Sequence, residues 1–329
     1  MLGFREGVGL VADLKTWGGE RASPARPTSR LASQAARSLW SDTWRTLRRD
    51  RAAMIGLALI VALALAAIFA PVLAPHDPNF GYREGLDERG FPLPPLSAGP
   101  PEQPPFYLGT DGLGRDILSR ILFGAQVALV IGIVANTLSM ALGTIAGLVG
   151  GYFPGVAGQV LMRFTDIIMA IPTLLLAMAL ITVLQPGLPV VILVIAFAYW
   201  TYLARIVFGE VRSMREKEFI EAARTIGASD ARIIFRHLLP NLVSTAIVYA
   251  TLSAATMILT EATLSFLGIG VRPPTPSWGA MLSEGQQFFL TSPWMMLYPG
   301  LALLLLLLGF NLLGDGLRDA LDPRTSQRR

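Results

Sequence analysis

The side chains that most often carry catalysis or bind metal ions are scarce in this sequence. It has no cysteine, and its two histidines, His76 and His237, lie far apart along the chain. Neither lysine, Lys15 or Lys217, follows a glycine, so no Gly-Lys-Ser/Thr phosphate-binding loop exists. No paired carboxylates and no Ser/His/Asp set are spaced for acid–base or nucleophilic catalysis. The sequence therefore predicts no catalytic residue, no metal site and no ATP bound by this chain.

One charged segment has the spacing of a partner-binding hairpin. Ser213 followed by Glu216 is a capping box, which predicts the start of a helix. Gly227 can adopt the left-handed conformation that ends a helix, and Ser229 or Asp230 can cap a second short helix. The expected structure is a helix–turn–helix hairpin.

The hairpin is expected to occupy residues 211–241, with Pro240 marking the entry to the following helix. The small side chains of Ala222 and Ala223 would let a partner approach closely. An ordinary charged loop with two capped helices and no partner is the alternative.

The spacing of the hairpin resembles the EAA loop of ABC importer permeases. The matching positions are Glu221, Ala222, Ala223, Gly227, Ala228, Leu239 and Pro240. The resemblance implies that these residues form a coupling helix that fits into a groove of an ATPase subunit. His237 stands where the general pattern has an aliphatic residue, as it tends to in the peptide-transport branch.

Four further segments resemble the dipeptide/oligopeptide/nickel permease family, in particular its C-type permease. They are residues 108–116, 261–270, 273–279 and 311–323. The resemblance extends over residues 40–324 and implies the fold of a type I ABC importer permease in the bacterial cytoplasmic (inner) membrane.

The resemblance also implies partners and substrates. Two separate ATPase subunits would bind ATP and Mg²⁺, a homologous second permease would complete the translocation path, and an extracytoplasmic binding protein would deliver substrate. Di- or oligopeptides are the implied substrates, and nickel or glutathione-like compounds are the alternative within the same importer class. One rival is a secondary transporter, which would need coupling-ion groups near the midplane, with Glu261 as the one candidate. The other is a non-transporting membrane scaffold or sensor, which would need an extra soluble domain or a signalling motif.

The elements that must position these residues are membrane-spanning helices. Only 15% of residues are charged, against about 25% in soluble domains, and 53% are hydrophobic. A helix needs roughly 20 apolar residues to cross a bilayer. The six predicted spans are residues 52–74, 125–149, 167–184, 188–208, 242–267 and 293–313. We therefore expect an all-α integral membrane protein.

The distribution of basic residues predicts the orientation. Ten of the 27 lysines and arginines precede residue 52, and seven lie between Arg205 and Arg236. Because cytoplasmic loops are enriched in basic residues, these regions and both termini are expected to be cytoplasmic. The formal net charge of +4 thus follows a membrane pattern and does not indicate nucleic-acid binding.

These observations divide the chain into five regions. The first is a cytoplasmic N-terminal tail, whose Arg-rich segment from Ser33 to Arg51 is expected to form an amphipathic helix on the lipid surface, with a disordered basic tail as the alternative. The expected regions are the tail 1–51, the first span 52–74, an external loop 75–124, the core 125–314 with its coupling loop 211–241, and a C-terminal cytoplasmic tail 315–329.

Each of two polar residues inside the predicted spans allows two interpretations. Glu261 is either a pore-facing or gating group, or a structural carboxylate that is hydrogen-bonded to neighbouring helices, because a charge in lipid is costly. Asn136 is expected to join helices, with pore lining as the alternative.

Asp111, Arg115 and Asp116 precede the second span on the external side. They either help to receive the substrate-binding protein or belong to a simple folded cap.

Small residues recur every fourth position in the second span, and this stripe predicts close helix–helix packing. The stripe comprises Ala135, Ser139, Gly143, Gly147 and Gly151. Pro172 is expected to bend the third span.

Overall fold

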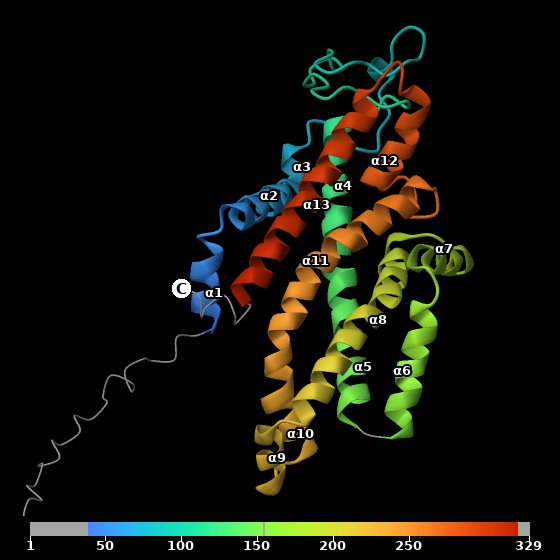
Figure 1. Cartoon of the computed structure of the whole chain (residues 1–329). Coiled ribbons are helices and arrows are strands. Elements are labelled where there is room, and N and C mark those ends of the chain that lie inside the picture. Colours follow the sequence, from blue (N-terminus) through green and yellow to red (C-terminus); the bar gives the residue numbers. More distant parts are fainter. Residues whose placement is uncertain (1–38, 154, 322–329) are drawn as a thin grey trace, which may run out of the picture. The chain divides into compact units, whose positions relative to one another are not determined.

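The computed structural model describes residues 39–153 and 155–321, and within these ranges every regular element beyond an isolated bridge is a helix (Figure 1). Five helical stretches are long and apolar enough to cross a membrane, and a bent pair makes six if it counts as one span. The stretches are Arg51–Ile68, Ile117–Tyr152, Leu188–Arg215, Asp230–Phe266 and Trp294–Leu321, and the bent pair is Val156–Met169 with Thr173–Leu184. The expected all-α membrane fold is confirmed, while the cytoplasmic placement of both termini stays a prediction.

The basic segment before the first span is not one helix running to residue 51. Its described part contains α1 (Leu39–Leu47), and the earlier residues of the expected amphipathic helix lie outside the described ranges. The first span, α2 (Arg51–Ile68), begins after Asp50, whose carboxylate accepts hydrogen bonds from two backbone N–H groups at 2.9 and 3.3 Å. The helix therefore breaks because Asp50 caps the helix that follows.

The external loop is shorter than the expected residues 75–124. It follows the short helix α3 (Ala70–Leu73) and ends at Asp116, which caps α4 (Ile117–Val130). The expected second span began only at residue 125, after Arg120. Arg120 is instead buried within a cluster of charged residues, so it is compatible with the first turns of a spanning helix.

The small-residue stripe makes the close helix–helix contact that was predicted, and its partner is the fourth span. A π-helical turn (Ile131–Ala135) joins α4 to α5 (Asn136–Tyr152), which packs along α8 (Leu188–Arg215). Cβ atoms added at Gly143, Gly147 and Gly151 would lie 2.6, 2.6 and 2.9 Å from the carbonyl oxygens of Trp200, Ala204 and Phe208. The backbones of α5 and α8 thus approach too closely for any larger residue at these positions.

The third span is not the continuous helix expected over residues 167–184. Instead, α6 (Val156–Met169) and α7 (Thr173–Leu184) meet at 91°. Pro172 stands directly before α7, so the predicted bend at this residue is confirmed. Proline lacks the N–H group that would continue the hydrogen bonds of α6, which explains the break.

The C-terminal helices also differ from their expected limits. The fifth span, α11 (Leu239–Phe266), is followed by α12 (Trp278–Gly285), which lies between it and the sixth span. The sixth span, α13 (Trp294–Leu321), continues well into the expected tail 315–329. Its last turns stay helical because the buried Gly316 lets α13 pack closely against α2. Residues 322–329 lie outside the described ranges.

Candidate functional site

A helical hairpin joins the fourth and fifth spans at the ends of α8 and α11 (Figure 1). It consists of α9 (Glu218–Thr225) and α10 (Asp230–Ile233). A π-helical turn (Ile234–Leu238) then connects α10 directly to α11, so that Asp230–Phe266 form one helical stretch. The second helix of the hairpin is thus an extension of a membrane span.

The hairpin begins later than the capping box predicted. Ser213 lies inside α8, which continues to Arg215, and α9 begins only after Lys217. The capping-box prediction is therefore wrong. The reason is packing: Val211 and Met214 are buried beneath the hairpin, and their contacts keep the last turns of α8 helical.

The turn between the two hairpin helices agrees with the sequence prediction. Gly227 has φ +82° and ends α9 in the left-handed conformation. Its N–H donates to the carbonyl of Arg224 (2.9 Å), and the N–H of Ala228 donates to the carbonyl of Ala223 (3.0 Å). These two bonds form a Schellman motif. The Ser229 hydroxyl then accepts a hydrogen bond at 3.4 Å from a backbone N–H of α10.

The two faces of α9 have different surroundings. Ile220 and Ala223 are buried against α8 and the start of α11, whereas Ala222 is exposed. Only one of the two alanines is therefore available to a partner. Three large apolar side chains of the hairpin and of the π-helical turn after it are exposed as well, and together with Ala222 we call them the hairpin surface: Phe219, Ile226 (85% exposed) and Phe235.

The sequence interpretation missed the three large residues of the hairpin surface. A signal was available for Phe219, because α9 carries apolar residues on both faces of a short charged helix, whereas Ile226 and Phe235 lie outside α9. Four further predicted positions differ in exposure: Glu221 and Pro240 are exposed, and Ala228 and Leu239 are half-buried.

Tyr152, the last residue of α5, contacts both the hairpin and the membrane helices. Its hydroxyl donates to Asp230 Oδ1 on α10 at 2.6 Å, and its carbonyl accepts from Arg215 Nη1 on α8 at 3.1 Å. The guanidinium of Arg224 on α9 lies 5.6 Å from its ring centroid. Tyr152 thus links the hairpin to the ends of α5 and α8.

Glu261 lies inside the helix bundle. Its side chain is 2% exposed, and its Oε1 accepts hydrogen bonds from the hydroxyls of Ser265 (2.7 Å) and Ser277 (3.0 Å). Ser277 also caps α12, so the carboxylate connects α11 with α12. This geometry favours the structural alternative for Glu261.

Asn136 joins α5 to α11. Its Nδ2 donates to the carbonyl of Ala250 (2.6 Å), and its Oδ1 accepts from the hydroxyl of Ser253 (2.9 Å). Both groups of the amide are used within the chain, which favours helix joining over pore lining.

The three polar residues of the external loop are buried in the chain. Arg115 Nε donates to Asp111 Oδ2 (2.6 Å), and Arg115 Nη2 donates to Glu284 Oε2 on α12 (2.7 Å). Arg120 Nε lies 3.4 Å from the same Asp111 oxygen. Asp116 accepts from the first turn of α4 and is fully buried. These contacts favour the folded cap, because none of these side chains is exposed to a binding protein.

Family comparisons agree with this architecture. Residues 139–327 match the model of the "Binding-protein-dependent transport system inner membrane component". Residues 38–95 match the "N-terminal TM domain of oligopeptide transport permease C".

The chain is also similar to bacterial proteins over most of their length. The chain is 41% identical over 311 residues to the "Glutathione transport system permease protein GsiD" of Escherichia coli O6:K15:H31 (strain 536 / UPEC), covering 94% of this chain and 98% of that protein. It is 43% identical over 288 residues to the protein of the same name from Shigella boydii serotype 4 (strain Sb227), covering 88% and 91%.

Among solved structures, the chain is similar to one from the inward-facing MetNI methionine ABC transporter. The TM-score is 0.50 at 19% identity, and the match covers 61% of this chain and 96% of the other. This likeness concerns the fold alone.

Proposed function

Because this chain belongs to the binding-protein-dependent transport inner membrane component family, and is a non-catalytic permease subunit of an ABC importer, we propose that it carries small peptides, with glutathione as the first candidate. It is a multi-pass protein of the bacterial inner membrane. The observation that carries the substrate proposal is the 41% identity to a glutathione permease over 94% of the chain. Glutathione is itself a small peptide, so this proposal unites the peptide prediction with its alternative.

The family implies ATPase and substrate-binding components as partners. We propose a complex with a homologous second permease, two ATPase subunits that bind ATP and Mg²⁺, and an extracytoplasmic binding protein. The two permeases would form the translocation path between them and alternate between inward-open and outward-open states.

We propose that the hairpin surface binds the ATPase subunit. Phe219, Ile226 and Phe235 expose apolar side chains, and the small Ala222 is exposed as well. A rim of charged residues with an apolar centre is typical of protein interfaces. Since Tyr152 connects the hairpin to α5 and α8, closure of the ATPases would move the spans that pack through the glycine stripe.

Co-purification from the native membrane tests the subunit composition. The chain is expected to be recovered with a second permease and ATPase subunits, which mass spectrometry would identify. Recovery of the chain alone, or only with copies of itself, would contradict the proposed complex.

Uptake measurements test the substrate. A strain lacking this chain is expected to lose accumulation of labelled glutathione or labelled dipeptide, and the chain supplied in trans should restore it. Unchanged uptake of both compounds in the deletion strain, combined with a normal importer complex, would exclude the small-peptide proposal and leave nickel complexes as the alternative.

Glu261→Gln is expected to keep uptake within about twofold of the parent, because the amide oxygen can accept the same two serine hydroxyls. Glu261→Leu should lower the thermal midpoint, since unpaired buried hydroxyls cost about 1–3 kcal/mol. Uptake and the midpoint of thermal unfolding are measured for both variants. A Gln variant that folds normally but does not transport would restore the gating alternative.

A further inference from the structure

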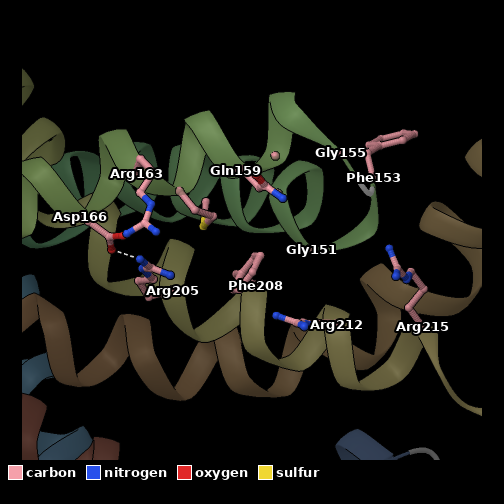
Figure 2. Close-up of a pocket in the computed structure, with 13 residues that line it drawn as sticks. Gly151, Phe153, Gly155, Gln159, Arg163, Asp166, Arg205, Phe208, Arg212 and Arg215 are labelled. Atoms are coloured by element: carbon pink, nitrogen blue, oxygen red, sulfur yellow. Dashed lines mark ion pairs between the residues drawn. The ribbon is translucent and has the colours of Figure 1, made fainter.

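A cavity of about 490 Å³ lies between the end of α5, α6 and the C-terminal half of α8. Four arginines line it (Figure 2). Arg163 comes from α6, and Arg205, Arg212 and Arg215 come from α8. None of the residues that line it belongs to the hairpin surface.

The arginines of α8 form a row. Arg205, Phe208, Arg212 and Arg215 follow one another at intervals of three or four residues, which places them on one helix face. At a rise of 1.5 Å per residue, the row extends about 15 Å along the helix. The cavity is therefore an elongated basic groove.

The positive charge of the groove is largely uncompensated. Asp166 is the one acidic residue that lines it, and this carboxylate forms an ion pair with Arg205 (Figure 2). Arg215 is directed to the carbonyl of Tyr152. Within residues 39–153 and 155–321, the side chains of Arg163 and Arg212 have no ion pair or hydrogen bond. The groove thus presents two free guanidinium groups to an anionic ligand.

An apolar stripe lies beside the groove on α6. Its members repeat at helical spacing and are strongly exposed: Val156, Val160, Phe164 and Ile167. At 100° per residue, Arg163 stands at the border between this stripe and the groove face that contains Gln159 and Asp166. A basic head-group site and a hydrophobic track for an acyl chain therefore adjoin one another.

We propose that this groove binds the phosphate of an anionic phospholipid in the cytoplasmic leaflet, with an acyl chain along the stripe of α6. Guanidinium groups bind phosphate oxygens in pairs of parallel hydrogen bonds, and basic pockets between spans on the cytoplasmic side suit such head groups. A zwitterionic peptide fits less well, because the single carboxylate that could hold its ammonium group is already paired with Arg205.

Lipid binding to the assembled importer tests the proposal. The complex is purified, delipidated and titrated by native mass spectrometry with phosphatidylglycerol or with phosphatidylcholine of the same acyl chains. The parent should prefer phosphatidylglycerol. Arg163→Gln/Arg212→Gln should weaken phosphatidylglycerol binding by roughly 30-fold. Each arginine near an anionic lipid contributes about 1 kcal/mol, which is slightly more than fivefold in affinity, and the variant removes two. The control Arg89→Gln/Arg318→Gln removes the same charge from exposed sites outside the groove and should bind as the parent does.

Three results would overturn the proposal. Equal binding of both lipids by the parent complex would show that the groove does not select an anion, and this comparison needs no variant. Undiminished phosphatidylglycerol binding by the folded double variant would place the lipid elsewhere. Displacement of the lipid by excess inorganic phosphate would assign the groove to a soluble anion.

Discussion

Gly227→Val is expected to reduce substrate uptake by more than tenfold while the membrane spans remain folded. Gly227 has φ +82° at the turn between α9 and α10. For ordinary residues the left-handed conformation costs roughly 1–2 kcal/mol, and a β-branched side chain is worse. A Cβ atom at this position would meet no other atom within 4 Å. The effect would therefore arise from the backbone conformation and not from a packing clash.

Valine would relieve this strain by leaving the left-handed conformation. The two Schellman hydrogen bonds donated by Gly227 and Ala228 would then be lost, and the hairpin surface would be displaced. Proteoliposomes containing the whole importer allow uptake and ATP hydrolysis to be measured together. We expect ATP hydrolysis that no longer responds to substrate, or ATPase subunits that fail to assemble.

Gly227→Asn is the matched control, because asparagine tolerates the left-handed conformation. It should retain most of the uptake, whereas Gly227→Ala should fall between the two. The thermal midpoint of the permease should change little in all three variants. Normal uptake in Gly227→Val would remove the coupling role from the hairpin.

Gly147→Leu is expected to prevent accumulation of the folded permease. A Cβ atom at Gly147 would lie 2.6 Å from the carbonyl oxygen of Ala204 and 2.6 Å from the Cβ of Val207. Neither atom can move by rotation of a side chain, so α5 and α8 would have to separate. Overpacking of this kind typically costs about 1–3 kcal/mol, and the loss of the contact along the stripe adds to it.

Gly209→Leu is the control for this variant, because it adds the same side chain to α8 at a position with open space. Nothing lies within 4 Å of a Cβ atom built at Gly209. The amount of protein in the membrane and its thermal midpoint in detergent provide the comparison. Equal stability of the two variants would show that the α5–α8 contact does not hold the fold together.

Part of the site could be predicted because its causes are local. The turn at Gly227 and the cap at Ser229 each depend on residue types within a few positions, and both were found as predicted. The stripe from Gly143 to Gly151 could be read in the same way, since small residues at every fourth position have one physical consequence in a membrane helix. The prediction that the chain has no catalytic residue rested largely on composition, since the sequence has no cysteine and only two histidines.

The limits of the helices could not be predicted, because contacts distant in sequence decide them. Arg120 can lie inside α4 because Asp111 and Glu284 form ion pairs with its buried guanidinium. The end of α8 depends on the burial of Val211 and Met214 against the hairpin, which a local capping pattern does not reveal.

The sequence by itself determined the all-α membrane fold, the bend at Pro172 and the hairpin turn, because hydrophobic length, proline and glycine act within a single segment. The tertiary structure decided which side chains are available. It buried Glu261 against Ser277 and turned Ala223 inward, and it brought the arginines of α6 and α8 together around one cavity. The physical reason is that burial and charge pairing depend on helices that meet only in the folded chain.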